Sequence, residues 1–121
     1  MRKIGLTLSK NNLDASLAQH FGKAKWILIY ENSKCFEFVR NENLIGRYVV
    51  DIFVQKECSD VICHHIGWGA HRHLQEKGIK TWHGPPKVSA QELLGQLTRE
   101  ELQEVIPIPS STPNRLRKGR E

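Results

Sequence analysis

In Val61-Ile62-Cys63-His64-His65-Ile66-Gly67-Trp68-Gly69-Ala70-His71-Arg72-His73, a short apolar run passes directly into a stretch with helical character. The apolar run of residues 61–63 predicts a short buried strand. The two glycines mark a turn. A helix is predicted from about residue 69 to residue 77, and Gly78 stands where a helix commonly ends. We therefore expect a strand followed closely by a helix.

The residues before this stretch predict an antiparallel meander and one helix. Residues 3–8 alternate between apolar and polar side chains, which is typical of a strand with one buried face. Residues 26–30 and 35–39 predict two more strands, joined by a hairpin turn. An apolar stripe at helical spacing predicts a helix ending near Cys58; it consists of Val49, Val50, Phe53 and Val54.

The residues after it predict a fifth strand at 79–82. Ser89 and Thr98 are each followed three residues later by a glutamate, which is the capping-box pattern for a helix start. Two short helices are therefore expected. Prolines, serines and basic residues dominate from residue 107 onward, so we predict one α/β domain at 1–106 and a disordered basic tail at 107–121.

This order of elements predicts an α/β fold with a five-stranded mixed sheet and flanking helices. The first three strands form the meander, and the fourth and fifth strands join the sheet in parallel through right-handed crossovers. Placing the fourth strand beside the first gives the strand order 3-2-1-4-5. The direction of travel across the sheet reverses between these two strands, and ligands favour the crevice at such a point.

Composition limits the class of protein. At 121 residues, with 39% hydrophobic and 26% charged residues, the chain matches a soluble one-domain protein. No apolar run approaches the roughly 18 residues that a membrane helix requires. Polar residues by Ser9 interrupt the N-terminal apolar run, so no signal peptide is predicted. We expect a cytoplasmic protein with no membrane contact.

The formal net charge of +5 is concentrated near the C-terminus. Basic residues there could bind nucleic-acid phosphates without sequence preference. No aromatic residues are interspersed to stack on single-stranded bases, so nucleic-acid binding stays an alternative that the sequence does not favour. The basic residues of the tail are Arg115, Arg117, Lys118 and Arg120, against Glu121.

Cysteine and histidine usage indicates a ligand site near residue 63. The chain has three cysteines, which are too few for a four-cysteine metal site within one chain, and they include no CxxC pair. Four of the six histidines lie between residues 63 and 73. Thiol and imidazole ligands beside a helix N-terminus suit a metal ion or an anionic metal–sulfur cluster. The predicted metal ligands are Cys63, His64 and His65; an inert buried thiol at Cys63 is the alternative.

Several motifs together resemble the dinitrogenase iron–molybdenum cofactor biosynthesis family, which contains the NifX-like carriers. These motifs are His20-Phe21-Gly22-Lys23-Ala24 before the second strand, Asp60-Val61-Ile62-Cys63, the Ile66-Gly67-x-Gly-Ala turn, and Gly78-Ile79-Lys80. The resemblance covers roughly residues 3–97. Histidines at positions 64, 65, 71 and 73 depart from the common family pattern.

The resemblance implies a ribonuclease H-like fold and a non-catalytic function. Members bind iron–sulfur or iron–molybdenum cofactor precursors and pass them between metallocluster assembly proteins, or to an apo-nitrogenase-like acceptor. The resemblance does not decide whether the protein forms a homodimer. The predicted cofactor-binding residues are His20, Lys23, Cys63, His64, His65, Gly67, Gly69 and His71.

Two other functions are alternatives to the carrier. A nuclease on this fold needs converging carboxylates, one of them on the first strand. The first strand here carries no acid, which argues against nuclease activity. A mononuclear zinc or iron protein using the histidines is the other alternative, although their spacing matches no standard zinc motif. His83 is expected to be a loop residue, and Cys35 and Cys58 structural.

Overall fold

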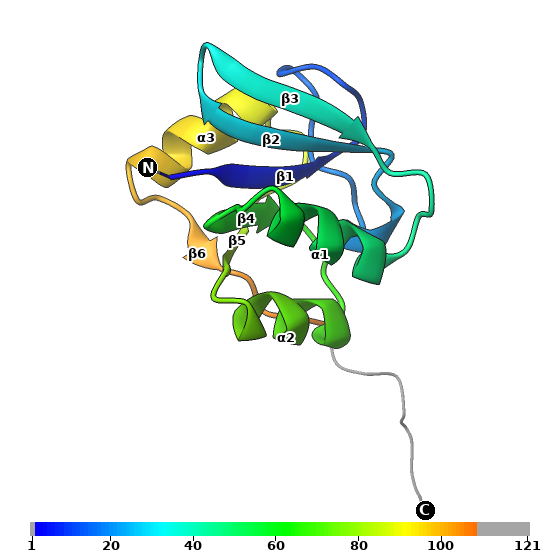
Figure 1. Ribbon diagram of the computed structural model, residues 1–121. Coiled ribbons are helices and arrows are strands. Elements are labelled where there is room, and N and C mark those ends of the chain that lie inside the picture. Colours follow the sequence, from blue (N-terminus) through cyan, green and yellow to red (C-terminus); the bar gives the residue numbers. More distant parts are fainter. Residues whose placement is uncertain (1, 109–121) are drawn as a thin grey trace, which may run out of the picture.

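The computed structural model describes residues 2–108, which form a mixed sheet with helices on both faces (Figure 1). The strands lie in the order β3-β2-β1-β4-β5-β6. The elements in chain order are β1 (Ile4–Leu8), a 3₁₀ turn η1 (Phe21–Lys23), β2 (Trp26–Asn32), β3 (Cys35–Arg40), α1 (Gly46–Gln55), β4 (Asp60–Cys63), α2 (Trp68–Glu76), β5 (Lys80–His83), α3 (Ala90–Thr98) and β6 (Gln103–Glu104).

The sheet has a separate apolar core on each face. Helices α1 and α2 pack on one face and α3 packs on the other. Alternate residues of β1 (Ile4, Leu6 and Leu8) face α3, as the alternating sequence predicts. A Cβ atom on Gly5 would collide with the ring of Phe53 in α1, so the close approach of helix and strand requires glycine here.

Strand pairing confirms the predicted order of the first five strands. β1, β2 and β3 form the antiparallel meander, whereas β4 is parallel to both β1 and β5. β4 is buried along its whole length. Its two-sided burial explains why residues 61–63 are a continuous apolar run rather than an alternating one.

The prediction of a five-stranded sheet was wrong, because β6 adds a sixth strand antiparallel to β5. Thr98, expected to begin a helix, is instead the last residue of α3. Glu100, with φ of 59°, lies in the left-handed region and stops the helix. Leu102 and Val105 are buried on opposite faces of the sheet. Their three-residue spacing suits a helix turn equally well, and a two-residue strand is too short to show alternation.

After β6 the chain returns along the start of α2. The Ile108 N–H donates to the Ile66 carbonyl at 2.8 Å, and the Ile108 carbonyl accepts from the Trp68 N–H at 3.0 Å. The remainder of the predicted basic tail, residues 109–121, lies outside the described residues. Within residues 2–108, no helix has the length and apolar character needed to cross a bilayer.

Candidate functional site

The C-terminal ends of β1, β4 and β5 meet at one edge of the sheet. β1 connects onward to β2 on one side, while β4 connects to β5 on the other, so the chain changes direction between β1 and β4. This is the predicted switch point. The loops that leave this edge are residues 9–20 after β1, residues 64–67 after β4 and residues 84–89 after β5.

Four histidines gather at this edge, and we call His20, His64, His65 and His83 the histidine cluster. The ring centroids of His64 and His65 are 4.2 Å apart, those of His64 and His83 5.2 Å, and those of His20 and His65 5.8 Å. His20 is exposed and the other three are half-buried. The cluster therefore forms a continuous, solvent-accessible row of imidazoles.

Backbone pairing holds two of these histidines beside each other. The His65 N–H donates to the Gln19 carbonyl at 3.1 Å, and the Phe21 N–H donates to the His65 carbonyl at 2.8 Å. This parallel bridge joins the loop after β1 to the loop after β4. Phe21 is buried between α1 and the sheet, which anchors His20 at the surface.

The geometry determines which nitrogen of His64 can act as a ligand. Its Nδ1 lies 3.0 Å from the Gly84 carbonyl oxygen. A carbonyl only accepts, so Nδ1 carries the proton and donates it. In the neutral ring, Nε2 then keeps its lone pair. A metal-ligating imidazole is commonly oriented in this way by its other nitrogen.

His83 is a member of the site that the sequence prediction missed. It pairs in register with Cys63, so the last residues of two parallel strands stand side by side. Burial, and then the neighbouring His64 and His65, lower the pKa of His83. The parallel alignment of strands 61–63 and 79–82 was the signal that could have found it, because parallel strands end at the same edge.

Cys63 does not face the histidine cluster. Its side chain is fully buried in the apolar core beneath α1 and α2. Burial raises the pKa of its thiol to about 12. The thiol is therefore protonated at neutral pH and lacks the anionic form that binds metals.

At the start of α2, two glycines leave the backbone exposed, with no side chain over it. Gly67 and Gly69 are exposed, and a Cβ on either would meet no atom within 4 Å. His71 is half-buried in α2; burial lowers its pKa, while Glu104 of β6 raises it. His71 takes part in none of the ring contacts that join the cluster. Lys23 is exposed at the end of η1, three residues from His20.

The arrangement is open, with no enclosing cage. Among the described residues, no three His, Cys, Asp or Glu side chains are grouped so that they could hold a metal ion. The row of imidazoles instead offers contact points along an exposed edge. Such an edge can touch one side of a larger metal-containing ligand and leave the rest accessible.

Comparison with known proteins gives a family match and several matches of fold. The model of the family described as dinitrogenase iron–molybdenum cofactor matches residues 2–100. The curated proteins include no match to the chain.

Three solved structures illustrate the fold matches. The apo form of the orange protein from Desulfovibrio gigas has a TM-score of 0.78 at 17% identity, and the match covers 95% of this chain and 98% of that one. A NifB candidate from Thermotoga has a TM-score of 0.74 at 23% identity, covering 86% and 93%. A dinitrogenase candidate from Methanocaldococcus jannaschii has a TM-score of 0.66 at 16% identity, covering 85% and 93%. Identities this low establish a common fold alone.

Proposed function

Because the chain belongs to the dinitrogenase iron–molybdenum cofactor family, we propose that it is a non-catalytic carrier of an iron–sulfur or iron–molybdenum cofactor precursor. Its fold would be of the ribonuclease H-like type. The carrier would receive its cargo from one metallocluster assembly protein and release it to another, or to an apo-nitrogenase-like acceptor. Family membership supports the broad class, and the histidine cluster supports the cargo.

The observation that carries the proposal is the row of imidazoles at the strand switch point. Along this edge the ring centroid of His65 lies 4.2 Å from that of His64 and 5.8 Å from that of His20. A neutral imidazole is a suitable ligand for exposed iron. The Nε2 lone pair of His64 is available because Nδ1 is committed to the Gly84 carbonyl.

The surroundings of the cluster suit an anionic cargo. Lys23 is exposed beside His20 and supplies positive charge. The N-terminus of α2 adds a partial positive charge at the exposed Gly67 and Gly69, beside the Trp68 N–H, which already donates to the Ile108 carbonyl. We do not include Cys63 among the ligands, because its thiol is buried and protonated.

An open site agrees with transfer of the cargo. A metal held by four protein ligands dissociates slowly, whereas one or two imidazoles hold a cluster loosely enough to release it. The absence of a three-ligand group among residues 2–108 is therefore consistent with a carrier. Storage of a single metal ion would demand the closed coordination that structural metal sites have.

The test is anaerobic incubation of the full chain with purified iron–molybdenum cofactor precursor or a synthetic iron–sulfur cluster. The carrier should acquire charge-transfer absorbance and comigrate with iron on size exclusion. His64→Ala together with His65→Ala should weaken binding by at least about tenfold and leave the circular dichroism spectrum unchanged.

His73→Ala is the matched control, since His73 is a half-buried histidine of α2 outside the cluster. This control should bind as the unmodified chain does. Equal binding by the His64/His65 double variant and the unmodified chain would overturn the proposed site. Failure of the unmodified chain to bind either cluster would overturn the function.

A further inference from the structure

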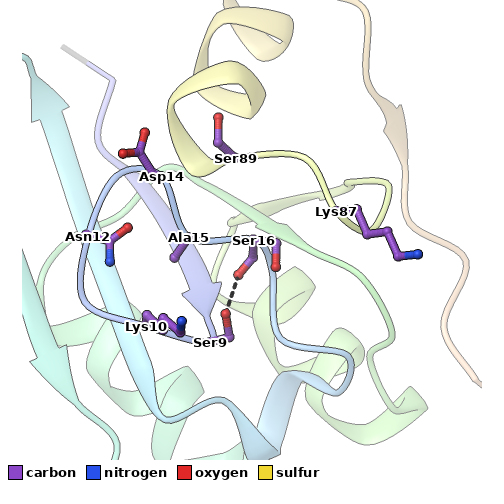
Figure 2. Close-up of a pocket in the computed structure, with 8 residues that line it drawn as sticks. All are labelled: Ser9, Lys10, Asn12, Asp14, Ala15, Ser16, Lys87 and Ser89. Atoms are coloured by element: carbon purple, nitrogen blue, oxygen red, sulfur yellow. Dashed lines mark hydrogen bonds between the residues drawn. The ribbon is translucent and has the colours of Figure 1, made fainter.

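A hollow lies on the same edge of the sheet as the histidine cluster, between the loop that follows β1 and the loop that follows β5 (Figure 2). It has a volume of about 510 Å³. We call it the loop pocket. The lining residues that matter for its chemistry are Lys10, Asn12, Asp14, Ser16, Lys87 and Ser89.

Backbone hydrogen bonds build the walls of the loop pocket. The Ala90 N–H donates to the Ala15 carbonyl at 2.8 Å, and the Gln91 N–H donates to the Leu13 carbonyl at 3.0 Å. Ser16 and Ser89 form an isolated antiparallel bridge. These contacts join the first loop to the start of α3, so the pocket is formed by the fold itself.

The lining is rich in unused donors. Neither Lys10 nor Lys87 forms an ion pair with any residue between 2 and 108. Figure 2 shows Lys10 and Lys87 at opposite sides of the pocket, with the exposed side chain of Lys87 directed outward. The Ser89 hydroxyl oxygen accepts from the Glu92 N–H at 3.1 Å, which leaves its own proton free to donate.

The balance of charge favours an anion over a cation. Two lysines line the pocket against one acid, Asp14. The first N–H groups of α3 are already bonded to Ala15, Leu13 and Ser89, so lysine and hydroxyl donors would provide the binding. Ammonium groups bind phosphate and carboxylate oxygens as point charges, and hydroxyls complete their hydrogen bonding.

We propose that the loop pocket binds a small oxyanion, carried by a phosphate or carboxylate group. Its volume lies within the range of about 300–1,000 Å³ typical of small-molecule sites, which suits a molecule larger than a bare ion. Residues 16–20 connect this pocket to the histidine cluster, since Ser16 lines the one and His20 belongs to the other. The inference does not depend on the identity of the cargo or on cargo binding.

The test is a titration of the full chain with inorganic phosphate and, separately, with succinate. Ionic strength is held constant with sodium chloride, and backbone amide resonances are followed by NMR. The expected shifts are confined to residues 9–16 and 87–91. Binding of one anion alone supports the proposal and names the group that the site prefers.

Charge variants make the test specific. Lys10→Gln with Lys87→Gln should weaken binding by at least about tenfold. The matched control, Lys34→Gln with Lys80→Gln, removes the same charge from exposed lysines elsewhere and should change affinity by less than about twofold. Asp14→Asn should strengthen binding, whereas Asp51→Asn, an exposed acid of α1, should not.

Three outcomes would overturn the proposal. One is no binding of either anion up to about 10 mM. Another is equal weakening by both lysine pairs, which would mean attraction by overall charge. The third is a pocket that responds to Mg²⁺ and not to the anions. The His64/His65 variant should bind these anions normally, so failure of the carrier proposal is distinguishable from failure of this one.

Discussion

Two adjacent residues at the end of β4, Cys63 and His64, lie in different chemical environments. Cys63 is fully buried under α1 and α2, while His64, the next residue, is half-buried and bonded to the Gly84 carbonyl. The cause is alternation, because successive side chains of an extended chain point to opposite faces. A thiol beside a histidine in the sequence is therefore no evidence that the two share a ligand.

Burial predicts which thiols react. Cys35 is exposed, whereas burial raises the pKa of both Cys58 and Cys63 to about 12. A disulfide reagent such as DTNB should modify one thiol per folded chain and all three in denaturant. A hydrogen bond to Glu31 raises the pKa of Cys35, so its rate of modification should keep increasing with pH up to and beyond 9.0.

The variant Cys35→Ser should lose the rapid phase of this reaction entirely. Rapid modification of a second thiol in the folded protein would show that the core around Cys58 or Cys63 opens. In that case the exclusion of Cys63 from the ligand set would no longer stand.

Among the elements, the shortest one completes both cores. β6 contains two residues, and each residue that flanks it in the sequence is buried. Leu102, just before β6, packs with α3, and Val105, just after it, packs beneath α1 and α2. The Val105 N–H also donates to the Thr81 carbonyl at 3.1 Å. The segment then continues to Ile108, which pairs beside the start of α2. Residues 102–108 thus cover the β5 edge and flank the helix terminus at the candidate site.

Adjacent residues of this segment allow a matched test. Val105→Ala should lower the free energy of unfolding by about 2 kcal/mol, since it removes buried methyl groups and leaves a cavity. Ile106→Ala should change it by less than about 0.5 kcal/mol, because Ile106 is 88% exposed. Urea unfolding measures both. Equal effects would mean that β6 is not packed as described.

At the scale of the whole molecule, one buried carboxylate connects the N-terminus to the middle of the sheet. Asp60 accepts from Arg2 Nε at 3.2 Å, from the Ser59 hydroxyl at 2.6 Å and from Trp82 Nε1 at 2.8 Å. It therefore joins the segment before β1 to β4 and β5. Burial tends to raise the pKa of Asp60, but these hydrogen bonds outweigh it and lower the pKa below 3.8.

This shift predicts acid sensitivity of the fold. A carboxylate with a lowered pKa in the folded state stabilises the protein above the pKa of the unfolded chain, near 3.8, and that contribution is lost as the pH falls below it. Asp60→Asn should cost about 2 kcal/mol at pH 7. The difference in the free energy of unfolding between Asp60→Asn and the unmodified chain should be smaller when urea unfolding is repeated at pH 3.

Asp51→Asn serves as the control, since Asp51 is an exposed acid of α1. It should leave stability unchanged at both pH values. A constant penalty for Asp60→Asn at all pH values would contradict the role assigned to its charge.

Local patterns accounted for most of the architecture. Alternation in β1, the apolar run of β4 and the stripe of α1 each reflect a repeat that burial imposes on a single element. The capping box at Ser89 correctly predicted the start of α3, because the cap is a local hydrogen bond to the Glu92 N–H. The same pattern failed at Thr98, where Leu102 and Val105 gain more burial by packing on opposite faces of the sheet.

The order of apolar and polar residues by itself predicts the antiparallel meander, the parallel pairing of β4 with β1 and β5, and the sheet edge at which ligands are expected. Each of these depends on short-range repeats and on the handedness of crossovers. Assembly of the sheet was needed to bring His83 to His64, to bury Cys63 away from them, and to form the pocket between the β1 and β5 loops. Those relations join residues that lie far apart along the chain or on opposite faces of one element. They follow from strand register and side-chain direction, which are defined when the two cores pack.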